Sequence, residues 1–158
     1  MARKKWLDDD EARAWHAFLA AAALLDRRLD QQLKDDAGIS HLQYEILVRL
    51  SANCDHEMRM SELADAVLNS KSGLTYQVSQ LEKAGLVRRR SCTSDDRAVF
   101  AVLTPKGKRL LERAAPGHVA LVRDLLIDVL TPEQRAAMAD GLGEVSRRLL
   151  AGEPARAR

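Results

Sequence analysis

Apolar residues recur every three or four positions over most of the chain, as they do along one face of a helix. The first such stretch covers residues 11–34, where one of the three aspartates at 8–10 can cap the start and Gly38 can end the helix. Later stretches with the same spacing predict helices over residues 40–50, 62–68, 71–84, 105–130 and 132–150.

The second and third helices have polar residues at their starts. Ser40 and Gln43 have the spacing of a capping box, in which each side chain bonds the backbone N–H of the other residue. Residues 51–57 are polar and predict a loop. Ser61 is then expected to cap the helix over 62–68.

The spacing changes after Gly85, which is placed to end a helix. Residues 86–92 and 98–103 are rich in residues that favour strands, and residues 93–96 favour a turn. The sequence therefore predicts a β-hairpin with a polar, charged tip.

The last third of the chain returns to helical spacing. Pro116, followed by Gly117, is expected to kink or break the helix over 105–130. Thr131 and Gln134 form a second capping-box pattern. Residues 151–158 are expected to form a flexible tail.

Two short helices joined by a tight turn and followed by a hairpin form a winged helix-turn-helix. We therefore expect a mainly α-helical protein with a small β-hairpin wing. In such a unit the second helix enters the major groove of DNA. Leu74, Val78 and Leu81 are spaced to hold the helix over 71–84 on the domain, and no carboxylate occurs on it before Glu82. Its polar residues suit contacts to bases and phosphates, and the candidates are Ser70, Lys71, Ser72, Thr75, Tyr76 and Gln80.

The predicted hairpin supplies a second basic region. Arg88, Arg89 and Arg90 lie at its root, and Arg90 is a candidate DNA contact. Arg97 follows the turn and is suited to a narrow minor groove, where Asp95 can hold its guanidinium in position.

Charge is unevenly distributed. Residues 1–57 carry 8 Lys and Arg against 11 Asp and Glu, a net charge of −3. Residues 58–109 carry 10 against 5, a net of +5, and residues 110–158 carry 7 of each. A basic middle segment in a chain of net charge +2 indicates a localised surface for a polyanion.

The stretch from Met60 to Lys108 resembles the MarR family of bacterial transcriptional regulators. The resemblance rests on several short pieces in a fixed order, and flanking helices of matching number extend it over nearly the whole chain. The pieces are Ser61-Glu62-Leu63-Ala64, Leu74-Thr75, Leu81 to Val87, Asp95-x-Arg97 and Leu103-Thr104-Pro105-Lys106-Gly107. Asp96 departs from the family, which often has a basic residue between that aspartate and arginine.

The resemblance implies an intertwined homodimer. Residues 10–34 and 108–150 would form the helical dimerisation region, and residues 40–104 the DNA-binding domain. The implied function is a sequence-specific transcriptional regulator, more often a repressor than an activator, that binds an inverted repeat in double-stranded DNA.

Members of this family often release DNA when a small aromatic or anionic molecule binds. Trp15 and His16 on the first helix, with His41 and Tyr44 at the start of the second, are candidates for such a site. The simpler alternative is that Trp15 and Tyr44 fill the core or an interface and that both histidines lie on the surface.

Other functional classes have little support. The four histidines are scattered, and no nucleophile motif, phosphate-binding glycine loop or metal-ligand cluster occurs, so neither an enzyme nor a cofactor is expected. Cys54 and Cys92 are too few for a disulfide framework, although Arg90 near Cys92 leaves a redox switch open. With no apolar run long enough for a bilayer and no signal peptide, a cytoplasmic location is expected. A winged domain that binds a protein instead of DNA remains the alternative function.

Overall fold

A computed structural model describes residues 6–91 and 98–152. These residues fall into two compact units, which divide after His118. Asp95, Arg97, Cys92 and the predicted tail from residue 153 onward lie outside the described residues. Among the residues described, no helix combines the length and apolar character that a bilayer span requires.

Helices α1 (Asp9–Ala37) and α2 (His41–Ala52) begin at the predicted caps. The Asp8 side chain accepts a hydrogen bond from the backbone N–H of Glu11, and Ser40 forms the predicted capping box with Gln43. Gly38 ends α1 with a φ of 69°, a left-handed conformation that glycine adopts without strain.

The sheet has three strands, one more than the sequence predicted. Strand β1 (Glu57–Arg59) pairs with β3 (Val99–Leu103), and β3 pairs with β2 (Val87–Ser91), all antiparallel in the order β1-β3-β2. The expectation of a loop over residues 51–57 was therefore wrong at both ends. Helix α2 continues to Ala52, and β1 is too short for an alternating pattern and forms through its pairing with β3.

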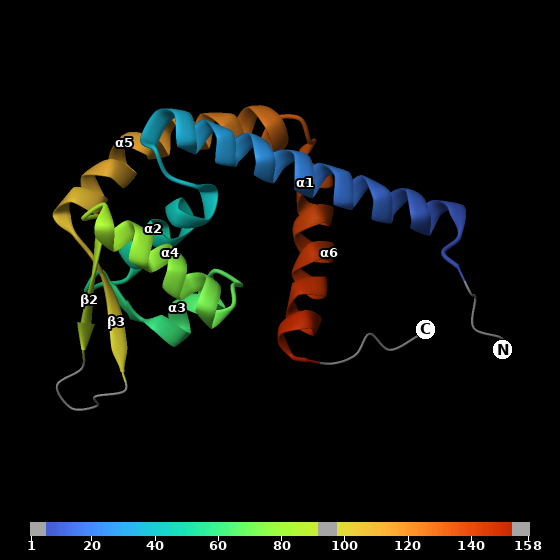
Figure 1. Cartoon of the computed structure of the whole chain (residues 1–158). Coiled ribbons are helices and arrows are strands. Elements are labelled where there is room, and N and C mark those ends of the chain that lie inside the picture. Colours follow the sequence, from blue (N-terminus) through green and yellow to red (C-terminus); the bar gives the residue numbers. More distant parts are fainter. Residues whose placement is uncertain (1–5, 92–97, 153–158) are drawn as a thin grey trace. The chain divides into compact units, whose positions relative to one another are not determined.

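Helices α3 (Met60–Ala66) and α4 (Lys71–Lys83) form the helix-turn-helix. The prediction that Ser61 caps α3 was wrong. The helix begins directly after β1, so Arg59 holds the cap position without a side-chain bond, and Ser61 lies inside the first turn. Figure 1 shows α2, α3 and α4 gathered beside β2 and β3.

The core of the first unit joins every one of these elements. Leu33 of α1 and Leu47 of α2 are fully buried with residues from α3, α4 and the sheet. The predicted anchors of α4 are buried too: Leu74, Val78 and Leu81. Burial of this apolar face fixes α4 and leaves its polar face outside.

Helix α5 (Pro105–Val122) continues through Pro116, so of the predicted kink or break the break does not occur. A proline removes one backbone hydrogen bond. Burial of Ala114 and His118 on either side of the proline holds the helix against the core.

The second unit begins at Val119 and continues as a π-helix, η1 (Arg123–Ile127), followed by α6 (Pro132–Leu150). Thr131 caps α6 through the predicted capping box with Gln134. Neither η1 nor α6 has a buried residue in the single chain.

Candidate nucleic-acid interface

The exposed face of α4 carries most of the predicted DNA contacts. The Ser70 hydroxyl caps the helix by accepting from the backbone N–H of Gly73 (3.1 Å). Lys71, Ser72, Thr75 and Tyr76 are exposed, and the Tyr76 side chain is 62% accessible although it is aromatic. The structure thus brings these predicted residues together on one surface.

Two glutamines of α4 lie closer to the body of the unit. Gln77 accepts a hydrogen bond from the side-chain amide of Gln43 on α2 (3.0 Å). Gln80 is half-buried, and with Tyr76 it lines an open hollow of about 470 Å³ beside the junction of α1 and α2. The start of α2 therefore supports the face of α4 from one side.

The far end of α4 is bonded to the sheet. Glu82 accepts hydrogen bonds from the backbone N–H (2.9 Å) and the Nε (2.8 Å) of Arg89 on β2. These bonds hold the pKa of Glu82 below its usual value. The first carboxylate on α4 is thus paired with an arginine and is not an isolated negative charge beside the polar face.

Arg90, a predicted DNA contact, has an ion pair within the sheet. Its Nη2 lies 2.5 Å from Oε1 of Glu57 on β1, and its guanidinium lies 4.8 Å from the centroid of the Phe100 ring. Glu57 neutralises much of this charge, so the main role of Arg90 is to link β2 to β1.

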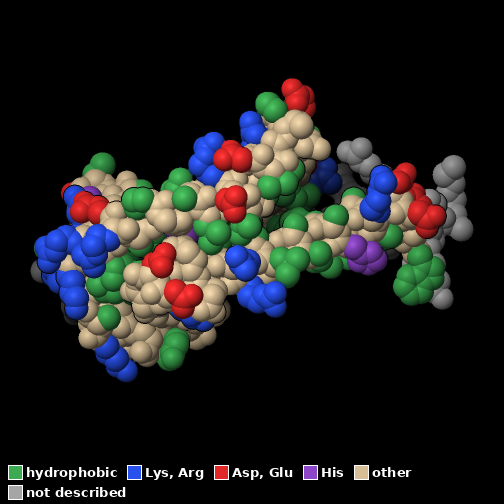
Figure 2. Space-filling view, turned by 90° about the horizontal axis from the view of Figure 1, so that it is seen from above, with side chains coloured by type: hydrophobic (Ala, Val, Ile, Leu, Met, Phe, Trp, Pro, Cys, Tyr) green, Lys and Arg blue, Asp and Glu red, His purple; other side chains and the backbone are tan. Residues whose placement is uncertain are grey.

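Basic side chains nevertheless gather on this part of the first unit. Figure 2 shows Lys and Arg side chains at the end of the molecule where Figure 1 places β2 and the start of α5. The exposed residues of these elements include Arg88, Lys106, Lys108 and Arg109. Lys106 donates to the backbone oxygen of Ala84, so part of this positive surface adjoins the C-terminal end of α4, and positive charge suits the DNA backbone.

The candidates for an effector site are only partly brought together. The rings of His41 and Tyr44 lie 5.6 Å and 4.4 Å from that of His118. Trp15 and His16 are exposed on α1, eleven and ten residues before Asp26, which bonds His41. At about 1.5 Å per residue, roughly 16 Å of helix separates the two groups within one chain.

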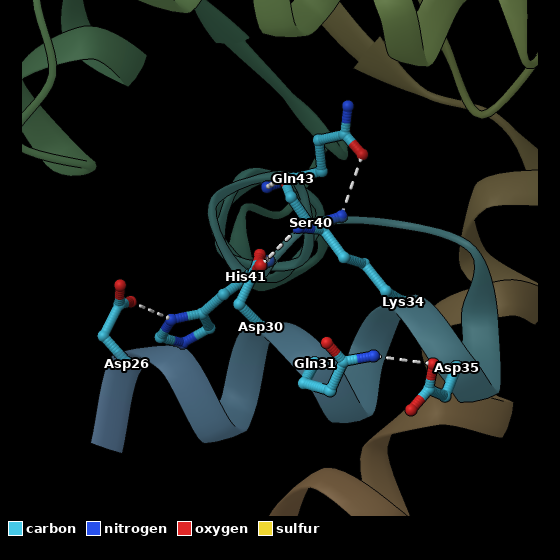
Figure 3. A network of polar contacts seen from close by, with 8 residues as sticks. All are labelled: Asp26, Asp30, Gln31, Lys34, Asp35, Ser40, His41 and Gln43. Carbon is cyan, nitrogen blue, oxygen red and sulfur yellow. Dashed lines mark hydrogen bonds and ion pairs between the residues drawn. The ribbon is translucent and has the colours of Figure 1, made fainter. Parts of the chain in front are cut away.

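A polar network fastens α1 to α2 beside this cluster (Figure 3). Asp26 contacts Nδ1 of His41 (2.9 Å), and Asp30 accepts from the backbone N–H of His41 (3.0 Å). Lys34 pairs with Asp30, and this bond and the bond from His41 lower the pKa of Asp30. Asp30 thereby satisfies an N–H at the start of α2.

His118 is a functional candidate that the sequence did not reveal. Its side chain is 7% exposed, its Nδ1 has no hydrogen-bond partner, and burial followed by the neighbouring His41 lowers its pKa. Burial also raises the pKa of Tyr44. The only signal was that His118 falls on the apolar spacing of α5, which does not distinguish a core residue from a functional one.

Comparison with known proteins agrees with this geometry. A sequence model of the MarR family matches residues 39–99. The chain is 31% identical over 147 residues to the HTH-type transcriptional regulator YfiV of Bacillus subtilis, covering 90% of this chain and 87% of that protein.

Two crystal structures from Streptomyces coelicolor are similar over nearly the full length. AbsC, a MarR family transcriptional regulator, is 41% identical with a TM-score of 0.89, covering 94% of this chain and 99% of AbsC. Sco3205, a MarR family regulator in complex with DNA, is 43% identical with a TM-score of 0.85, covering 97% and 94% of the two chains.

Proposed function

The chain belongs to the MarR family of transcriptional regulators, and from this premise we propose that it represses transcription by binding an inverted-repeat operator as a homodimer. Two copies of α4 would enter successive major grooves about one helical turn apart. A dimer bound at a promoter would block RNA polymerase.

The observation that carries this proposal is the exposed face of α4. It is polar and free of carboxylates from Ser70 to Gln80, and the buried side of the same helix holds it rigidly on the core. We propose base and phosphate contacts by Ser70, Lys71, Ser72, Thr75, Tyr76 and Gln80. Arg90 would support the edge of this interface. Arg97, braced by Asp95, would reach the minor groove, as the family resemblance implies.

Exposed apolar side chains support the homodimer. On α1, Trp15 and Phe18 are 49% and 45% exposed, and their rings lie 6.3 Å apart. In the second unit, Val145 and Leu149 of α6 are also exposed. Large apolar side chains left in water on two elements are typical of surfaces that a second subunit covers.

We further propose that a small aromatic or anionic effector releases the DNA, and the cluster of His41, Tyr44 and His118 supports this part of the proposal. An aromatic or anionic molecule bound against these rings would contact the junction of α1, α2 and α5. In a dimer, Trp15 and His16 would contribute from the partner subunit. A coupling of about 1–3 kcal/mol between effector and DNA would be sufficient for regulation.

The test is selection of bound sequences from a random duplex pool at near-physiological salt. Enrichment of an inverted repeat with half-sites about one turn apart supports a dimeric, sequence-specific regulator. Thr75→Ala should then alter which bases are tolerated, whereas Lys71→Ala should weaken binding to all sequences alike. A folded dimer that enriches nothing would favour the alternative that the winged domain binds a protein.

A further inference from the structure

The end of α4 is joined to the start of α5 by a set of directional bonds. The backbone carbonyls of Ala84, Gly85 and Leu86 follow α4, and each accepts a hydrogen bond from the start of α5. The Nζ of Lys106 donates to Ala84 (2.7 Å), the Thr104 hydroxyl to Gly85 (2.7 Å), and the Thr104 backbone N–H to Leu86 (3.1 Å). Carbonyls at a helix end have no partner within the helix, so the start of α5 supplies the donors that α4 lacks.

Thr104 bonds both helices through one hydroxyl group. Its oxygen accepts from the backbone N–H of Gly107 (3.0 Å) and so caps the first turn of α5. Its proton is shared between two carbonyls, and Gly85 is nearer than Leu86 (2.7 Å against 3.0 Å). Gly107 has no room for a Cβ atom against the backbone oxygen of Leu86. The two helix ends are thus held together by directional bonds and by a close approach of their backbones.

These bonds restrict the tilt of α4 in a way that its apolar face does not. Leu74, Val78 and Leu81 hold the helix on the core, but the hydrophobic effect has no direction and permits small rotations and shifts. Hydrogen bonds weaken steeply when their angle changes. Lys106 is exposed, so its bond to α4 orients the helix end without filling any part of the core.

The angle between α4 and α5 determines which operators a dimer can bind. One base pair added between two half-sites moves one of them about 3.4 Å along the DNA and about 34° around it. A dimer can follow that change only if its two α4 helices can tilt. We infer that Thr104 and Lys106 are positioning residues, which fix the angle of α4 to α5 and thereby the half-site spacing that the dimer accepts. This inference rests on the proposed function.

The test compares the affinity of the full-length protein for the selected operator with its affinity for operators that have one base pair added or removed between the half-sites. Lys106→Met should lower this ratio at least about fivefold, the factor that corresponds to one hydrogen bond. Lys106→Arg retains a donor and should retain the ratio. Lys108→Met removes the same charge from an exposed side chain of α5 that, among the described residues, makes no bond to α4. That control should keep the wild-type ratio whatever its overall affinity.

Thr104→Val removes the hydroxyl that bonds both helices and should lower the ratio as well, whereas Thr104→Ser should retain it. A merely structural role, or a phosphate contact by Lys106, would weaken binding to all three operators alike. If Lys106→Met keeps the wild-type ratio, or if the wild type binds all three spacings equally, the inference is wrong while the proposed function stands. A wild-type protein that selects no inverted repeat would instead refute the proposed function itself.

Discussion

His118 places a titratable ring in the core of the first unit. Burial, and then the neighbouring His41, hold its pKa below the ordinary value of 6.5, and Glu45 acts in the opposite direction. The unfolded chain therefore takes up a proton at a higher pH than the folded protein does. As the pH falls below about 6.5, the free energy of unfolding should fall. The stability that comes from keeping His118 neutral should be fully lost once the pH has passed below the lowered pKa of the folded protein.

Urea unfolding at pH 7.5 and pH 5.5 checks this expectation. The loss of stability between the two values should be smaller in His118→Leu than in the wild type. His16→Gln, which alters an exposed histidine of α1, is the matched control and should behave like the wild type. An unchanged pH dependence in His118→Leu would show that other groups cause it.

Leu68, in the turn between α3 and α4, is an apolar residue in an unfavourable conformation. Its φ is 52°, and its side chain is 77% exposed. A side chain costs about 1–2 kcal/mol in the left-handed region, and little packing offsets that cost here. Leu68→Gly should therefore stabilise the protein by about 1 kcal/mol in chemical denaturation. Leu68→Ala, which keeps the Cβ atom, should give little gain.

Single side chains were predictable from the sequence where periodicity determines them. Leu74, Val78 and Leu81 predicted which side of α4 is buried, and therefore which side is free to bind. Their long-range partners were not predictable. The bonds of Gln77 to Gln43 and of Arg90 to Glu57 span more than thirty residues, and no local pattern in the sequence indicates them.

The close approach of α5 to the backbone of Leu86, just before β2, depends on a residue without a side chain. A Cβ atom at Gly107 would lie 2.2 Å from the backbone oxygen of Leu86 and 2.8 Å from Cδ1 of Leu103. The backbone oxygen of Leu86 cannot move away as the end of a flexible side chain can. Gly107→Ala should therefore destabilise the protein by at least about 2 kcal/mol.

Gly141 on α6 provides the contrasting case. A Cβ atom there would meet nothing within 4 Å. Alanine is favoured over glycine inside a helix, so Gly141→Ala should stabilise α6 by about 0.5–1 kcal/mol. Thermal denaturation of both variants measures the contrast, and similar melting temperatures would contradict the packing described for Gly107.

The helix starts marked by a capping box were the most predictable feature of the secondary structure. The capping boxes at Ser40 and Thr131 are local, so the sequence alone specifies them. Strand β1 was missed because it forms only by pairing with β3, and Ser61 was misassigned as a consequence. Pro116 was expected to disrupt α5, but tertiary burial outweighs the loss of one backbone bond.

The assembled protein is proposed to be a dimer, and its apolar surfaces allow a direct test. Phe18→Glu places a charge among exposed apolar residues of α1. Burying that charge between subunits would cost several kcal/mol, so sedimentation should show dissociation toward monomers and weaker operator binding. Ala52→Glu adds the same charge at the exposed end of α2. That control should remain dimeric, and a dimeric Phe18→Glu would exclude this face of α1 from the interface.

The end of α4 is held from two sides. Arg89 of β2 bonds Glu82, and Lys106 of α5 donates to the backbone oxygen of Ala84 (2.7 Å). Helix α4 and the sheet are therefore expected to keep a fixed spacing when they bind DNA. The duplex would then adjust its twist and groove width to fit them. Base pairs that no side chain touches would then influence affinity through their deformability, and operators with stiff or flexible spacers should bind differently despite identical contacted bases.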